Sequence, residues 1–108
     1  LVASRLEGPL REGPLIVTTN EQDIIKVSSS SSVQDVGAAL AHKMYDDRQA
    51  VVRGVGAGAV NQAAKAIAVA SGFAAPRGLS LACRIGFDTV PGRDGKDISA
   101  VSFHVFTL

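Results

Sequence analysis

Three alternating glycines mark the part of this chain whose residue types are best suited to bind an anion. Gly54, Gly56 and Gly58 follow a β-branched segment and precede an alanine-rich stretch that carries an Asn-Gln pair and a lysine. Glycine accepts positive φ angles and has no Cβ, and the first N–H groups of a helix are available to an acceptor. The pattern therefore predicts a helix N-terminus that faces an anion such as a phosphate or a nucleic-acid backbone.

The glycine run does not fit the two nucleotide-binding motifs that it partly resembles. Gly54, Gly56 and Ala59 would match a dinucleotide fingerprint, which also needs an acidic residue about 20 positions later. The chain has no carboxylate between Asp47 and Asp88, and no Gly-Lys-Ser or Gly-Lys-Thr of a P-loop follows the glycines. We therefore expect no nucleotide cofactor, and the sequence predicts none of another kind.

Other reactive side chains lack the partners that catalysis or metal binding requires. Alternation places Cys83, the single cysteine, on the apolar face of a strand, which predicts an inert core thiol. His42 and His104 have no i, i+4 partner or cluster typical of metal ligands. The aspartates at 46–47 and at 94 and 97 are explained by turn chemistry. We expect neither enzyme activity nor a metal site.

Composition predicts one small domain without a strong overall electrostatic field. The chain has 108 residues, 46% of them apolar, and a formal net charge of +1. Residues 23–108 contain nine basic and seven acidic side chains, so any basic surface must be local. A lone cysteine, the absence of an apolar run of about 20 residues and the lack of a signal-peptide pattern predict a cytoplasmic protein without a membrane partner.

The chain divides into a lead-in and a domain. Residues 1–22 contain a repeated Glu-Gly-Pro-Leu and are expected to be a flexible lead-in or a docking arm, with residues 15–19 able to pair as an edge strand. Residues 23–108 are expected to form the folded domain. Its first strand is predicted at residues 23–28, before the serine tract at 28–32.

Hydrophobic periodicity predicts two helices and three more strands. A helix begins after Ser32, or after Ser31 with Gln34, and ends near residues 46–47; its apolar face carries Val33, Val36, Leu40 and Met44. A strand at 50–53 leads to a second helix over about 59–71, stopped at Gly72, with an apolar side of Val60, Ala63, Ala64, Ile67 and Ala70. Strands at 79–88 and 98–107 flank a solvated loop at 90–97. The core face of the first of these strands is predicted to carry Leu79, Leu81, Cys83, Ile85 and Phe87. The core face of the second is predicted to carry Val101, Phe103 and Val105.

The order β-α-β-α-β-β predicts a two-layer α/β sandwich, with both helices on one face of a mixed four-stranded sheet. The other face is expected to combine polar and apolar side chains and to be a possible oligomer contact. Its residues include Lys26, Arg84, Ser102, His104, Ile98, Ala100 and Phe106.

Several segments resemble one bacterial family. They include Asp-Ile-Ile-Lys-Val-Ser at residues 23–28 and Gly-Ala-Gly-Ala-Val-Asn-Gln-Ala-Ala-Lys-Ala-Ile-Ala at 56–68. This pattern resembles the stage V sporulation protein S family, which is similar to Alba chromatin proteins and to the C-terminal domain of translation initiation factor 3. The resemblance implies the fold named above and a small DNA- or RNA-binding protein connected with sporulation, often a homodimer or higher homo-oligomer, without enzyme activity.

The resemblance also implies which residues contact the nucleic-acid backbone. The implied set is Gly56, Ala57, Gly58, Asn61, Gln62 and Lys65. Beyond the resemblance, we expect contacts from Arg53, a cation at the end of a strand, and help from Lys26, Lys43, Arg77 or Arg84. Capping and close helix packing explain the glycines and the Asn-Gln pair equally well. A second hypothesis, favoured by the near-neutral charge, is a structural or assembly module that forms oligomers or docks within a larger protein.

Overall fold

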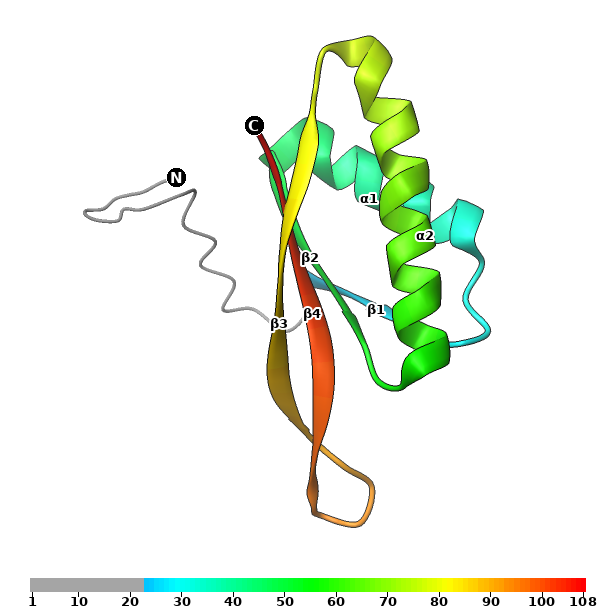
Figure 1. Ribbon diagram of the computed structural model, residues 1–108, viewed down its shortest axis with the longest axis vertical. Helices are drawn as coiled ribbons and strands as arrows, with labels where there is room; N and C mark the ends of the chain where they lie inside the picture. Colours follow the sequence, from blue (N-terminus) through cyan, green and yellow to red (C-terminus); the bar gives the residue numbers. More distant parts are fainter. Residues whose placement is uncertain (1–22) are drawn as a thin grey trace, which may run out of the picture.

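A computed structural model describes residues 23–108 as a helical layer packed on one face of a sheet (Figure 1). The predicted fold class is confirmed. The predicted strand at residues 15–19 and the lead-in at 1–22 lie outside the described residues. The elements are β1 (Ile24–Val27), α1 (Val33–Asp47), β2 (Gln49–Gly54), α2 (Ala57–Ala74), the 3-10 turn η3 (Ala75–Arg77), β3 (Leu81–Pro91) and β4 (Asp97–Thr107).

The four strands form one mixed sheet in the order β1-β2-β4-β3. β1 and β2 are parallel, whereas β4 runs antiparallel to both of its neighbours. Val52 pairs with Phe103, and both side chains are buried under the helices. Along β2 and β4, the residues next to Val52 and Phe103 point to the opposite face of the sheet, because side chains alternate along a strand.

Ser32 fixes the start of α1. Its side chain accepts a hydrogen bond from the Asp35 backbone N–H at 3.2 Å, and this bond satisfies one donor of the first turn. The helix includes Asp46 and Asp47 and ends at Arg48, which adopts a left-handed conformation with φ 63°. The predicted stop near residues 46–47 is therefore correct to within one residue.

α2 is longer than predicted and buries a row of alanines. Gly72 does not stop it, because this glycine keeps a helical backbone; Gly78, with φ 80°, takes the left-handed position after η3. Ala64 was expected in the apolar face but is exposed. The buried positions are Ala59, Ala63, Ala66, Ala70 and Ala74.

The prediction that the apolar side of β3 lies in the core is wrong. Ile85 is 62% exposed, Phe87 is 83% exposed, and Cys83 is exposed too. The reason is topological, since both helices pack over β1 and β2 while β3 is at the far edge of the sheet. Leu79 precedes this strand, and Leu81 is only half-buried.

β3 and β4 continue beyond the rest of the sheet as a two-stranded arm (Figure 1). β2 pairs with β4 only as far as Val101, whereas β3 follows β4 to the pair Pro91–Asp97. The strands therefore occupy both ends of the predicted loop at residues 90–97. A short turn closes the arm, with the Gly92 N–H bonded to the Lys96 carbonyl at 2.8 Å.

The contact between the helices predicts opposite effects for two glycine-to-alanine changes. A Cβ at Gly37 would lie 2.5 Å from Val69 Cγ1, whereas a Cβ at Gly72 would have no neighbour within 4 Å. We expect Gly37→Ala to lower the free energy of unfolding by about 1–3 kcal/mol through overpacking. Gly72→Ala should raise it by about 0.5–1 kcal/mol, because alanine is the better helix former.

Urea unfolding followed by circular dichroism measures both effects. The two variants add the same methyl group to an exposed and a buried helix position. A Gly37→Ala protein as stable as the parent would show that the helices do not depend on this close approach.

Candidate nucleic-acid interface

The first turn of α2 presents backbone donors without a side-chain cap. Gly56 precedes the helix with φ 89°, and its carbonyl accepts the first helical bond from the Val60 N–H at 3.0 Å. The N–H groups of residues 57–59 therefore precede the helical hydrogen-bond ladder. This turn contains no acidic residue, so nothing there offsets the partial positive charge of the helix end.

The three glycines of the run have different roles. A Cβ at Gly58 would lie 2.8 Å from the Ser29 Cβ, and one at Gly54 would lie 3.0 Å from the Ala59 Cβ. These two glycines permit close packing. Gly56 has open space around the position of a Cβ and needs glycine for its positive φ. The packing and the anion-facing interpretations of the run therefore apply to different residues.

Gln62 ties α2 to the turn formed by the serine tract. Its Nε2 donates to the Ser31 carbonyl at 2.9 Å, and Asn61 Nδ2 donates to the Gln62 Oε1 at 3.2 Å. Within the turn, the Ser28 N–H donates to Ser31 Oγ at 2.9 Å. Together with the Gly58–Ser29 contact, these bonds place serine hydroxyls beside the start of α2. Sequence reasoning treated the tract only as a strand end and a helix cap, although its five consecutive serines were a signal.

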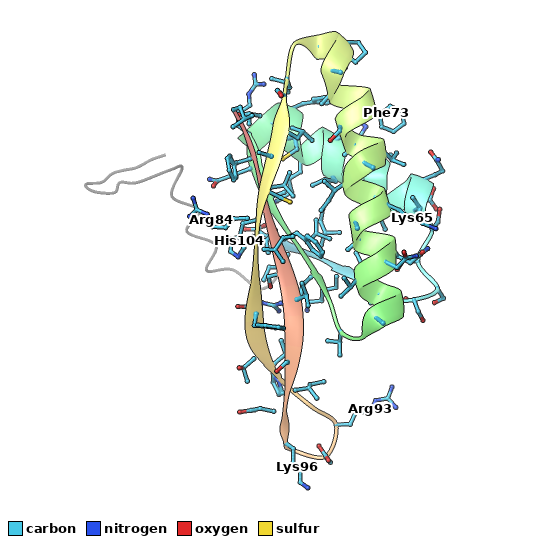
Figure 2. The ribbon with its side chains drawn as sticks, viewed as in Figure 1. Lys65, Phe73, Arg84, Arg93, Lys96 and His104 are labelled. Carbon is cyan, nitrogen blue, oxygen red and sulfur yellow. The ribbon has the colours of Figure 1, made fainter. Side chains whose placement is uncertain are left out.

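Lys65 lies one turn after Asn61 on the same side of α2. Both side chains are exposed, and residues four apart are neighbours on a helix surface. Figure 2 shows Lys65 on the side of α2 that faces away from the sheet. The lysine therefore adds positive charge beyond the uncapped first turn.

Lys26 and Arg53 are adjacent across the β1–β2 pair, at the end of the sheet near the serine turn. Arg53 is mostly buried, and its Nη2 lies 3.1 Å from Asp88 Oδ2. Both cations line a cavity of about 550 Å³ between the strand ends and the hairpin arm. Its other lining residues are Val27, Ser28, Ser29, Gly54, Val55, Val90 and Pro91.

Three predicted contacts lie elsewhere in the molecule. Arg77, beyond the opposite end of α2, has its guanidinium 3.9 Å from the centre of the Tyr45 ring. Arg84 lies on the sheet face away from the helices, beside His104 (Figure 2). Lys43 forms ion pairs with two aspartates, at 3.8 and 3.6 Å. Lys26 and Arg53 also lie on the sheet face away from the helices, but their cavity is bordered by Gly54 and the serine turn, which lead to the start of α2. The three residues above do not line that cavity.

Two cations at the tip of the hairpin arm were missed. Arg93 and Lys96 are exposed, and Figure 2 shows both at the tip. The turn residues of this segment predict a solvated loop. These basic residues project away from the sheet because β3 and β4 are long, and the sequence did not predict that length.

Asp88 joins three strands on the face away from the helices. Its Oδ2 accepts hydrogen bonds from Ser102 Oγ and Arg53 Nη2. The Ser102 bond, followed by the Arg53 bond and charge, lowers the pKa of Asp88, against the opposing effect of burial. Burial lowers the pKa of His104, an effect that Asp88 opposes and that Arg84 and Arg53 reinforce.

These two shifts predict that stability falls on acidification in two windows. The neutral form of His104 is favoured in the folded state, so stability falls as the pH drops below its ordinary pKa of 6.5. The carboxylate of Asp88 is also favoured on folding, so a further loss follows below its ordinary pKa of 3.8. Urea unfolding at a series of pH values should show a smaller first loss in His104→Gln and a smaller second loss in Asp88→Asn. Unchanged pH profiles in both variants would contradict the assignment.

Within residues 23–108, neither helix combines the length and hydropathy that a membrane span requires. In the same part of the chain, no three His, Cys, Asp or Glu side chains are grouped so that they could share a metal ion.

Comparison with known proteins tests the family prediction. Among solved structures, the chain is similar to Alba from Thermoplasma volcanium, with 16% sequence identity over 77% of this chain and 98% of that chain, and a TM-score of 0.46. Residues 23–108 match the family model described as Stage V sporulation protein S. The match covers every described helix and strand. The chain therefore belongs to the stage V sporulation protein S family.

Proposed function

We propose that this protein binds nucleic acid through the sugar-phosphate backbone. The observation that carries the proposal is the uncapped first turn of α2, which has no acidic residue and lies against the serine turn. Backbone N–H groups at a helix N-terminus and serine hydroxyls are both common donors to phosphate oxygens. Lys65 supplies a charge on the same helix, and the contacts carry no base-specific information.

The hairpin arm extends this surface. The tip of the arm and the start of α2 lie at the same end of the molecule (Figure 1). The cavity lined by Lys26 and Arg53 also borders the serine turn and the end of β3 at Val90 and Pro91. Arg93 and Lys96 at the tip would contact phosphates beyond those reached by α2.

The modest charge predicts weak, salt-sensitive binding. Residues 23–108 have nine basic and seven acidic side chains, and Arg53 is already paired with Asp88. If Lys65, Arg93 and Lys96 each neutralise one phosphate, the logarithm of the association constant should fall with the logarithm of salt concentration with a slope of about −2 to −3. This is too few contacts for a protein that coats chromatin by charge alone.

The family name refers to sporulation, and we propose that nucleic-acid binding serves a developmental programme of this kind in the cytoplasm. The role is one of binding rather than catalysis. The site offers donors and positive charge but no nucleophile with an adjacent base.

Fluorescence anisotropy with labelled DNA and RNA at low salt tests the proposal. Lys65→Glu should weaken binding by about tenfold, because a phosphate contact is replaced by repulsion. The double variant Arg93→Glu/Lys96→Glu should weaken it further. Arg77→Glu is the matched control, since it changes net charge as Lys65→Glu does, at the far end of α2.

Two results would overturn the proposed surface. One is no binding by the parent protein at low salt. The other is an equal loss in Lys65→Glu and Arg77→Glu, which would show that net charge acts without a defined site.

An assembly module is the second candidate, favoured by the exposed apolar side chains on the sheet. Ile98 is 43% exposed, and Phe106 is half-buried on the face away from the helices. In this case self-association should survive Lys65→Glu and weaken when Ile98 or Phe106 is made polar. Light scattering on these variants distinguishes assembly from nucleic-acid binding.

A further inference from the structure

A cavity of about 410 Å³ lies where the end of α1 meets the turn between α2 and β3. It is lined by Tyr45, Arg48, Arg77 and Leu79. Both arginines are exposed, whereas the tyrosine and the leucine are half-buried. Two positive charges therefore border a hollow whose other walls are an aromatic ring and an aliphatic side chain. Its volume is within the range of about 300–1,000 Å³ that is typical of small-molecule sites.

Arg77 is positioned before any ligand binds. The Tyr45 hydroxyl donates to the Phe73 carbonyl at 3.2 Å, which holds the tyrosine ring against the end of α2. The guanidinium carbon of Arg77 lies over this ring, 3.9 Å from its centre. Stacking uses the flat face of a guanidinium and leaves the N–H groups at its edge available to an acceptor. The cation–π contact therefore orients the arginine without using its hydrogen-bond donors.

Arg48 occupies a backbone position at which glycine is the usual residue. It ends α1 with φ 63°, and its N–H donates to the Met44 carbonyl at 3.0 Å. Its own carbonyl accepts a bond from the Thr107 N–H at 3.3 Å, which ties this corner to the end of β4. A side chain in the left-handed conformation costs energy, and residues in such conformations cluster at functional sites. The backbone alone therefore does not account for an arginine here.

The charges of the two arginines are not neutralised within the part of the chain that the structure describes. Among residues 23–108, the side chains of Arg48 and Arg77 form no ion pair. Asp47, the carboxylate next to Arg48 in the sequence, lies 3.6 Å from the Lys43 ammonium instead. Two guanidinium groups beside one cavity match a phosphate monoester, which has a charge of about −1.5 to −2 and accepts paired N–H bonds.

We propose that this cavity binds a small phosphate monoester. Both arginines donate to the phosphate group, and the side chains of Tyr45 and Leu79 pack against the rest of the molecule. A monoester suits the two positive charges better than a nucleic-acid backbone phosphate, which has a single negative charge. The inference goes beyond nucleic-acid binding, since none of these residues lies on the first turn of α2 or at the tip of the arm.

Isothermal titration calorimetry tests the proposal with adenosine monophosphate and phenyl phosphate. Adenosine and phenol are the matched compounds, which lack the phosphate. At least one monoester should bind saturably, and its matched compound should bind at least about tenfold more weakly, because only the phosphate engages the guanidinium groups. Equal binding within both pairs, or no binding of either monoester at millimolar concentration, would overturn the proposal.

Arg48→Gly separates binding from folding. It should weaken monoester binding by about tenfold or more, because one guanidinium is lost. The thermal midpoint should stay the same or rise, because glycine readily adopts the φ of 63° found there. Arg84→Ala is the matched control, since it removes the same charge from a residue that does not line the cavity. An equal loss of affinity in the two variants would contradict a defined site.

Two further measurements identify the source of the phosphate and separate this site from the nucleic-acid surface. A short phosphoserine peptide should bind no more tightly than the small monoesters; tighter binding would assign the cavity to a protein partner and overturn the proposal. The monoester should leave the anisotropy of DNA bound to the parent protein unchanged, because the cavity lies at the other end of α2 from its first turn. Displacement of DNA would place the monoester at the first turn instead. If the parent protein binds no DNA, calorimetry still tests the cavity by itself.

Discussion

The close approach of α1 and α2 is the constraint on which the rest of the structure depends. Gly37 of α1 leaves no room for a methyl group beside Val69 of α2, and a Cβ there would also lie 3.1 Å from the Ala66 carbonyl. α2 meets the core with alanines, so small side chains set the distances between helix and helix and between helix and sheet. Larger residues at these positions would separate the layers.

This packing connects the core to the start of α2 and to the exposed edge of the sheet at β3. Close contact of Gly54 with Ala59 and of Gly58 with Ser29 fixes the start of α2 against the end of β2 and the serine turn. The same arrangement makes the helical layer narrow, so that it covers β1 and β2 and leaves β3 bare. The donor-rich helix end and the exposed apolar edge are therefore two results of one packing scheme.

Much of the fold could be predicted because local patterns agree with it. Ser32, the apolar face around Leu40 and Met44, and the alternation in β4 gave the correct elements, and the segment containing Asn61 and Lys65 gave the correct family. The burial prediction that failed depends on the position of a strand within the sheet. The alternation of Cys83, Ile85 and Phe87 is the same in an edge strand as in a central one, so sequence alone could not show that these residues are exposed.

The candidate site was predicted in part for a similar reason. The residues that start α2 are contiguous, so their proximity follows from the chain itself. Arg77 and Arg84 were included on charge alone, and only the fold shows that one lies beyond the opposite end of α2 and the other on the opposite face of the sheet. The hydrogen bond from Gln62 to Ser31 joins segments 31 residues apart and has no local signal.

In the proposed complex, the start of α2 and the tip of the hairpin arm contact nucleic acid. The most direct measurement is an NMR titration of ¹⁵N-labelled protein with a short DNA duplex at low salt. We expect the largest amide shift changes at residues 56–59 and 92–96, with residues 75–78 unaffected. Changes confined to β3, or none at all, would contradict it.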